Sequence, residues 1–316
     1  MFVGGLAMIL AGANFMTDGS AALARRFGMS DFIVGLTIVS MMTSAPELVV
    51  SITSALNAST DMAIGNVVGS NIFNILMIVG ICACIKPIKV TDTLLANEIP
   101  LVILSSVALL AIGMSPLLDG TAGAQISRTD AILLFLFFIV FLRYTIASAK
   151  KTRANNPEET GRKKELPLWQ QLIYIGGGLA ALIFGGQWFV DGASQLARMF
   201  GMSDAMIGLT IIAAGTSLPE LATSVAAAMK GFPGMCIGNV IGSNIFNIFF
   251  VLGITGMIKP LGFGSIGALD LLVLTGASVL FWLVGRFQGP RIISRSEGAM
   301  MVLLYVGYIA TLCLML

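Results

Sequence analysis

The stretch Thr43-Ser44-Ala45-Pro46-Glu47 places a carboxylate and a proline inside the apolar range 32–56. An ionised side chain at such a position in a membrane costs about 2.5–3.5 kcal/mol or more, so its presence indicates a functional site. Pro46 has no N–H to donate, and irregular backbone at membrane depth persists only inside protein or beside a water-filled cavity. Thr43 and Ser44 precede Glu47 by four and three residues, which places the three side chains on one helix face. These five residues therefore predict an oxygen-only site for a hard cation such as sodium, calcium or magnesium.

The overall composition is that of a polytopic membrane protein. The chain of 316 residues is 57% hydrophobic and 11% charged, and its mean hydropathy is +0.94. Windows of about 20 apolar residues, the length that spans a bilayer as a helix, predict ten transmembrane helices and therefore an all-α fold. The predicted spans are 2–24, 31–56, 62–85, 97–116, 129–148, 171–197, 204–229, 235–258, 267–286 and 297–315.

The two halves of the chain repeat each other. Residues 18–87 align without a gap to residues 191–260, and about 38 of the 70 positions are identical, so the first motif recurs as Thr216-Ser217-Leu218-Pro219-Glu220. An odd number of helices in each copy inverts the second copy in the membrane, as in many secondary transporters. We therefore predict a five-helix transmembrane repeat at 1–149, a cytoplasmic linker at 150–170 and a second, inverted five-helix repeat at 171–316.

The positions of lysine and arginine predict the orientation of the chain. If the N-terminus lies outside, only Arg128, Arg198 and Lys259 of the 18 lysines and arginines fall on the outer side. This asymmetry agrees with the excess of positive charge in cytoplasmic loops. We expect a multi-pass protein of the plasma (inner) membrane of a prokaryote, with both termini extracytoplasmic.

A second polar motif follows each of the first motifs. Residues 65–74 read Gly-Asn-Val-Val-Gly-Ser-Asn-Ile-Phe-Asn, and residues 238–247 differ from them at one position. Ser70 and Asn74, like Ser243 and Asn247, are four residues apart, so each pair presents a hydroxyl and an amide on one face. Close helix packing through the glycines is the alternative interpretation. The recurrence of the motif after both carboxylates favours a binding site.

Asp18 and Asp191 form a further pair of repeat-related carboxylates, inside the first and sixth predicted spans. We interpret them as helix-end carboxylates with local hydrogen bonds. The alternative is that they shape an entry path for ions, and neither residue is included in the predicted site.

At these four motifs the sequence resembles the sodium/calcium exchanger family, within the wider cation/calcium exchanger superfamily. The resemblance covers the whole ten-helix layout. It implies a core of the second, third, seventh and eighth helices, across which the first and sixth helices slide. It also implies Glu47 and Glu220 as the central ion ligands. The other oxygens that it implies are the side chains of Thr43, Ser44, Ser70, Asn74, Thr216, Ser217, Ser243 and Asn247 and the backbone carbonyls of Ser40 and Ala213.

The chain departs from the family pattern at two kinds of position. Met42 stands where the second copy has Gly215, which bears on the bend of the second helix. Positions 74 and 247 are both asparagine, whereas potassium-dependent members have aspartate at the latter, so we expect no potassium dependence. Proton/calcium exchangers usually show Gly-Asn-Ala-x-Glu where this chain has Thr-Ser-x-Pro-Glu. This difference favours sodium as the counter-ion.

The predicted function is sodium/calcium antiport by alternating access, with the ions bound near the membrane midplane between the two repeats. The alternative is calcium/proton antiport, in which the same two glutamates would carry the protons. The sequence has no histidine to activate Ser44 or Ser217, so we predict no enzymatic activity. A channel could use the same oxygens as a filter, but the inverted repeat favours alternating access. We expect no cofactor, no nucleic acid and no obligatory protein partner, only the lipid bilayer and the transported sodium and calcium ions.

Overall fold

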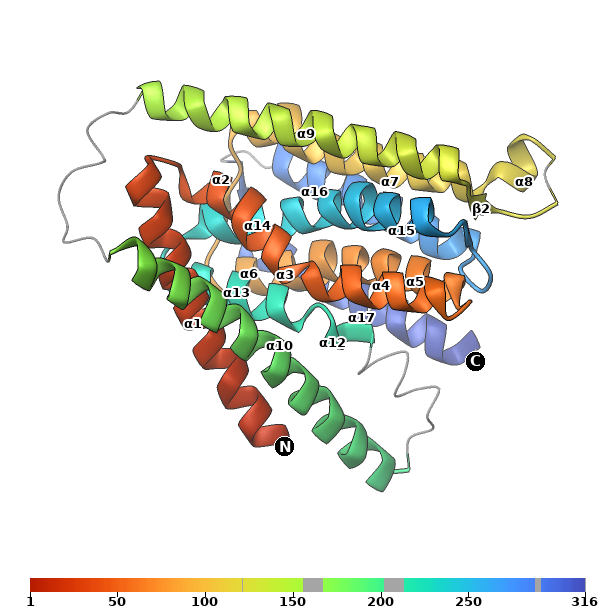
Figure 1. The fold of residues 1–316 in the computed structure, drawn as a ribbon, viewed down its shortest axis with the longest axis horizontal. Coiled ribbons are helices and arrows are strands. Elements are labelled where there is room, and N and C mark those ends of the chain that lie inside the picture. Colours follow the sequence, from red (N-terminus) through yellow and green to blue (C-terminus); the bar gives the residue numbers. More distant parts are fainter. Residues whose placement is uncertain (121, 156–166, 202–212, 288–290, 316) are drawn as a thin grey trace.

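The computed structural model describes residues 1–120, 122–155, 167–201, 213–287 and 291–315, and it consists mainly of long helices (Figure 1). This confirms the prediction of an all-helical, multi-pass membrane protein. Among the described residues, nine helices are long and apolar enough to span a membrane: Phe2–Phe27, Asp31–Leu56, Thr60–Ile85, Leu94–Gly113, Arg128–Ala149, Leu168–Met199, Pro233–Ile258, Ala268–Phe287 and Arg295–Leu314. The predicted span 204–229 lies partly outside the described residues.

Several spans consist of shorter elements in series, and three of these spans contain a π-helical segment (η) close to the candidate site. The first half of the chain contains α1 (Phe2–Phe27), α2 (Asp31–Val34), η1 (Gly35–Val39), α3 (Ser40–Thr43), α4 (Ala45–Leu56), α5 (Thr60–Ile72), η2 (Phe73–Ile78), α6 (Val79–Ile85), β1 (Ile88–Lys89), η3 (Leu94–Glu98), α7 (Ile99–Gly113), α8 (Ser115–Leu118), β2 (Gln125–Ile126) and α9 (Arg128–Asn155). The second half contains α10 (Leu168–Met199), α12 (Ala213–Gly215), α13 (Leu218–Met229), α14 (Pro233–Ile245), η6 (Phe246–Val251), α15 (Leu252–Ile258), β3 (Leu261–Gly262), α16 (Ala268–Phe287), β4 (Ile292–Ile293) and α17 (Arg295–Met315).

The helix that carries each predicted carboxylate is interrupted just before it. Ser44 separates α3 from α4 with φ −82° and ψ 4°, and Ser217 separates α12 from α13 with φ −90° and ψ 6°. The proline of each motif follows in the first turn of the new helix, where its missing N–H needs no partner. Glu47 and Glu220 therefore lie in the first turns of α4 and α13. Free N–H groups and the positive end of the helix dipole favour a carboxylate there.

The spans Thr60–Ile85 and Pro233–Ile258, which are the third and eighth of the ten predicted spans, form the interior of the bundle. In an 18-residue apolar stretch of each span, the buried share is 72% for Thr60–Ile85 and 78% for Pro233–Ile258. The corresponding share is 17% for Arg295–Leu314. A Cβ atom added to Gly238 would lie 2.3 Å from the carbonyl oxygen of Phe32. The backbones of α14 and α2 therefore touch, as small residues allow in membrane helices. The second glycine-containing motif thus packs helices as well as carrying polar side chains.

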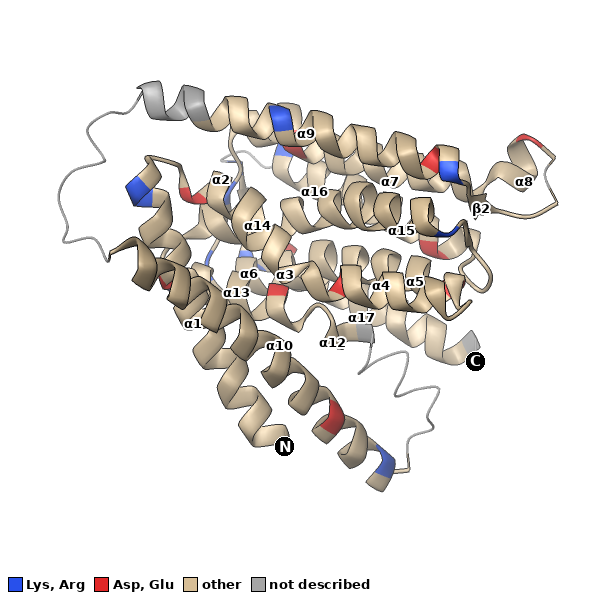
Figure 2. Cartoon of the chain, viewed as in Figure 1, with Lys and Arg blue, Asp and Glu red and all other residues tan. Residues whose placement is uncertain are grey.

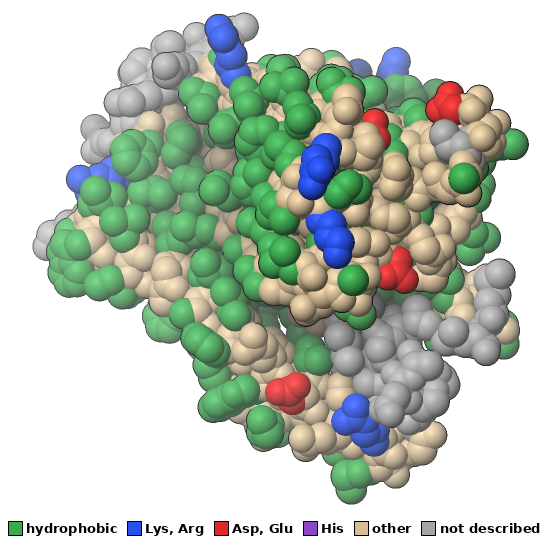
Figure 3. Space-filling model, turned by 45° about the vertical axis from the view of Figure 1, so that its right-hand side comes forward, with side chains coloured by type: hydrophobic (Ala, Val, Ile, Leu, Met, Phe, Trp, Pro, Cys, Tyr) green, Lys and Arg blue, Asp and Glu red, His purple; other side chains and the backbone are tan. Residues whose placement is uncertain are grey.

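Short antiparallel strand pairs connect the two halves outside the helices. In the register of β1 and β4, Ile88 lies opposite Ile293, and in that of β2 and β3, Gln125 lies opposite Gly262. Charged residues are sparse along the helices (Figure 2). Hydrophobic side chains cover much of the face drawn in Figure 3. An apolar surface of this kind suits contact with lipid.

The helices α1 and α10 lie side by side and are inclined to the other helices (Figure 1). Glycines recur every seven residues on both helices and face the partner: Gly5, Gly12 and Gly19 on α1, and Gly178, Gly185 and Gly192 on α10. A Cβ atom on Gly12 would lie 2.7 Å from the carbonyl oxygen of Gly178, and one on Gly185 would lie 3.0 Å from that of Gly5. Because the two backbones are in contact over about the whole length of α1, the pair is packed as one unit.

Two adjacent glycines of α10 provide a direct test of this packing. A Cβ atom on Gly185 would lie 2.8 Å from Cβ of Met8, whereas one on Gly186 would meet nothing within 4 Å. We expect Gly185→Ala to destabilise the protein by about 1–3 kcal/mol through overpacking. Gly186→Ala should be neutral or slightly stabilising, because alanine favours the helix. Thermal unfolding in detergent measures both, and equal midpoints for the two variants would contradict the tight pairing.

Candidate functional site

The serine of each first motif contacts the glutamate of the other. Glu47 and Glu220 are both 0% exposed. The Ser44 hydroxyl donates to Oε1 of Glu220 at 3.1 Å, and the Ser217 hydroxyl donates to Oε1 of Glu47 at 3.4 Å. The contacting residues are 170 and 176 positions apart in the sequence, and the two motifs therefore form one polar cluster between α4 and α13.

The second motifs add hydroxyls and amides to this cluster. The Ser70 hydroxyl donates to Oε1 of Glu47 at 3.5 Å, and its repeat counterpart Ser243 lies beside the Glu220 carboxylate. The other two predicted side chains of these motifs, Asn74 in η2 and Asn247 in η6, are both 0% exposed. The segments η2 and η6 pack against α13 and α4, the helices of Glu220 and Glu47, so both asparagines lie on elements next to the two carboxylates.

The two predicted threonines are held crosswise by asparagines of the second motifs. The Thr43 hydroxyl donates to Oδ1 of Asn239, and the Thr216 hydroxyl donates to Oδ1 of Asn66, both at 3.2 Å. Neither asparagine was among the predicted site residues. Their recurrence at the same place in both repeats is the sequence signal that could have found them.

The two predicted backbone ligands, the carbonyls of Ser40 and Ala213, are described to different extents by the structure. The Ser40 carbonyl already accepts the N–H of Ser44 at 3.0 Å and the hydroxyl of Thr43 at 3.4 Å. Any cation at Ser40 would therefore share this carbonyl with two hydrogen-bond donors. Ala213 begins α12, one turn before Ser217, and the structure describes only its backbone.

Several oxygens of the cluster are buried and have no hydrogen-bond partner among the described residues. They are Oε2 of Glu47, Oε2 of Glu220, Oγ of Ser243, Oδ1 of Asn74 and Oδ1 of Asn247. A buried polar atom without a partner costs about 1–3 kcal/mol, so a cation bound by these oxygens would offset part of that cost. Carboxylate, amide and hydroxyl oxygens are the ligands that sodium and calcium prefer.

The formal charge of the cluster comes from the two glutamates alone. Over the ranges that the structure describes, no group of three or more histidine, cysteine, aspartate or glutamate side chains could hold a metal ion. The donor set is therefore two carboxylates among neutral oxygens. Such a set suits a hard cation that is bound and then released. It is less suited to a transition metal that is held permanently.

The family of the chain follows from comparison with known proteins. The family model described as "Sodium/calcium exchanger protein" matches residues 1–147 and 170–314. The chain belongs to the sodium/calcium exchanger family. The resemblance inferred from the four motifs is thereby confirmed.

Relatives of this exchanger match it over nearly its whole length. It is 39% identical over 313 residues to CaxA of Alkalimonas amylolytica, a match that covers 96% of this chain and 95% of that protein. It is 30% identical to the sodium/calcium exchanger MaX1 of Methanosarcina acetivorans, with 98% and 96% covered. A solved structure of the sodium-calcium exchanger NCX_Mj superposes with a TM-score of 0.82 at 32% identity, covering 98% of this chain and 96% of that chain.

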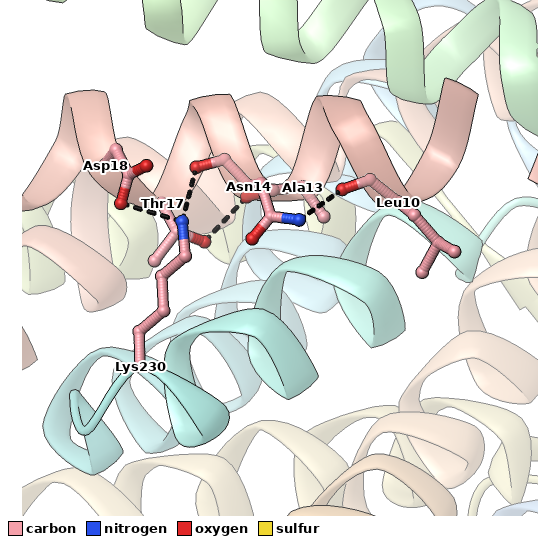
Figure 4. Close-up of polar contacts among 6 residues, drawn as sticks. All are labelled: Leu10, Ala13, Asn14, Thr17, Asp18 and Lys230. Atoms are coloured by element: carbon pink, nitrogen blue, oxygen red, sulfur yellow. Dashed lines mark hydrogen bonds and ion pairs between the residues drawn. The ribbon is translucent and has the colours of Figure 1, made fainter. Parts of the chain in front are cut away.

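In this exchanger an ion pair connects α1 with α13, the helix of Glu220. Lys230, at the C-terminal end of α13, donates to Oδ1 of Asp18 at 2.7 Å and to the carbonyl oxygen of Asn14 at 3.0 Å (Figure 4). The interpretation of Asp18 as a locally bonded carboxylate is therefore wrong. The repeat counterpart of Lys230 is Asn57, which has no charge. The equivalent pair, Asp191 with Asn57, therefore cannot be an ion pair.

Proposed function

We propose that this exchanger carries calcium out of a prokaryotic cell in exchange for sodium, with both ions binding at the cluster of Glu47 and Glu220. The observation that carries the proposal is the crosswise contact of the two first motifs, in which each serine donates to the glutamate of the other motif. This contact brings two buried carboxylates together, and one oxygen of each has no hydrogen-bond partner among the described residues. The proposed ligands are the predicted set, with Ser40 and Ala213 contributing backbone oxygens. The proposed orientation is the predicted one, with both termini extracytoplasmic and the linker 150–170 in the cytoplasm.

Competition for one set of oxygens would couple the two ions. Two glutamates carry a charge of −2, which one calcium or two sodium ions neutralise. Because the same oxygens would bind either ion, occupancy by one excludes the other. A third sodium would leave one net positive charge and make exchange sensitive to the membrane potential.

The packing of the helices supports alternating access by sliding. In our proposal the paired helices α1 and α10 move together across a core that contains α4, α5, α13 and α14. The glycine contacts hold α1 to α10 and also α14 to α2. In inverted-repeat transporters, alternating access is largely a rigid-body movement of one bundle against another, and the α1–α10 pair is packed as such a unit.

The experiment that tests this function uses purified protein in liposomes loaded with sodium and diluted into sodium-free medium that contains radioactive calcium. We expect calcium uptake that the sodium gradient drives and that a protonophore does not abolish. Empty liposomes and a medium with equal sodium on both sides are the controls. Uptake that follows a pH gradient instead would establish calcium/proton antiport, and uptake that needs no counter-ion would indicate a channel.

A further inference from the structure

Asn66 and Asn239 each hold the helix that carries the glutamate of their own repeat. The side-chain amide of Asn239 contacts the Ser224 hydroxyl at 2.9 Å and the backbone carbonyl of Glu220 at 3.4 Å. The amide of Asn66 contacts the Ser51 hydroxyl and the backbone carbonyl of Glu47, both at 3.2 Å. The pattern is the same in both repeats, and each asparagine is thereby attached to the first turns of α4 or α13.

The other end of each asparagine contacts the opposite repeat. A backbone carbonyl only accepts hydrogen bonds, so the carbonyls of Glu47 and Glu220 must face the NH₂ group of the asparagine. This fixes the orientation of both amides and turns Oδ1 of Asn239 toward Thr43 and Oδ1 of Asn66 toward Thr216. Because Oδ1 can only accept, each threonine hydroxyl donates its proton in its contact with the asparagine. For Thr43 the Ser40 carbonyl, at 3.4 Å, is a second and longer acceptor for the same proton.

A hydroxyl that has given its proton to a fixed acceptor presents only lone pairs to its other neighbours. Lone pairs are what a cation needs from a ligand. Thr43 lies one helical turn before Glu47 across the break at Ser44, so its free lone pairs can serve the same ion. In a metal site, residues that orient a ligand in this way strengthen binding without touching the metal.

We propose that Asn66 and Asn239 are positioning residues of the cation site, each of which orients the threonine ligand of the opposite repeat and ties the two half-sites together. This inference rests on the proposed function, because it requires that the site bind calcium. Loss of Asn66 would leave the Thr216 hydroxyl free to turn its proton toward the ion. Loss of Asn239 would leave Thr43 only the longer contact with the Ser40 carbonyl to direct its proton. Calcium affinity would fall, although the contacts of Asn66 and Asn239 are only with protein.

Double-mutant cycles separate this role from simple helix packing. Calcium affinity is measured by calorimetry on the full-length protein in detergent for Asn239→Ala, Thr43→Val and the double variant. We expect each single substitution to weaken binding about 10- to 100-fold, the range for residues that orient a metal ligand. The double variant should bind calcium as tightly as the single variant with the lower affinity. The reason is that the second substitution removes an interaction that the first has already removed.

The matched control cycle pairs Asn239→Ala with Thr216→Val, which do not contact each other. There the two fold-changes should multiply. The reciprocal set, Asn66→Ala with Thr216→Val against Asn66→Ala with Thr43→Val, gives an independent test if a variant at the more buried Asn239 does not fold. The thermal midpoints of the ion-free variants report packing separately from binding.

Two results would overturn the inference alone. One is multiplication of effects in the contacting pairs, and the other is equal coupling in contacting and control pairs, as a general loss of packing would give. Wild-type protein that binds no calcium in the same measurement would instead overturn the proposed function, and this inference with it. The wild-type titration therefore comes first and distinguishes the two failures.

Discussion

Glu220→Gln is expected to lower calcium affinity at least about 100-fold and to abolish sodium-driven calcium uptake, and Glu47→Gln is expected to do the same. Two unit charges of opposite sign about 4 Å apart attract each other by about 4 kcal/mol at the effective dielectric constant near a protein surface. The attraction is larger for calcium, because the ion is divalent. Glutamine keeps the size of the side chain and an oxygen that can accept from Ser44 or Ser217. The loss would therefore report the missing charge rather than a cavity.

Glu98→Gln is the matched control for these two substitutions. Glu98 is also buried within a span, at 3% exposure, and accepts a hydrogen bond from Tyr144 at 2.9 Å. It takes no part in the cluster of Glu47 and Glu220, so its substitution should leave calcium affinity within about twofold of wild type, as for independent sites. Calorimetry and liposome uptake measure all three variants. Uptake retained by either cluster variant, or lost equally in Glu98→Gln, would refute the assignment of the site.

A covalent link between positions 18 and 230 is expected to abolish exchange and to spare calcium binding. Asp18 belongs to the α1–α10 pair and Lys230 to α13, so sliding would separate them. Their side chains are 51% and 26% exposed. Such an exposed ion pair contributes at most about 1 kcal/mol, which is small enough to break during each transport cycle. A covalent link could not break, and the protein would be held in one access state.

The link can be made with a short bis-maleimide in an Asp18→Cys, Lys230→Cys variant, after the partly exposed Cys84 and Cys313 are replaced by serine. The matched control links Phe15→Cys to Tyr174→Cys, because these two rings lie 5.3 Å apart within the α1–α10 pair. That link should leave exchange intact, since the two helices move together. Normal exchange after linking positions 18 and 230, or equal inhibition by both links, would contradict the sliding of α1 and α10 over α13.

The sequence alone determined the class of protein, nine of the predicted spans and the family. These properties follow from apolar length and from the cost of a carboxylate in a membrane, which are legible along one stretch of chain. The gapless repeat likewise identified Glu47 and Glu220 together. Their ion-binding role and the inverted arrangement of the two halves stay predictions that the experiments above address.

The tertiary structure decided which groups meet. Helical spacing predicted that Ser44 and Glu47 share a face, but the helix breaks at Ser44, and its hydroxyl contacts Glu220 instead. The roles of Asn66 and Asn239 and the ion pair of Asp18 with Lys230 also involve partners at least 150 residues apart in the sequence. Spacing along one helix describes only neighbours within about a turn. The packing of one repeat against the other brings the distant partners together, and it is this packing that places two buried carboxylates in one site.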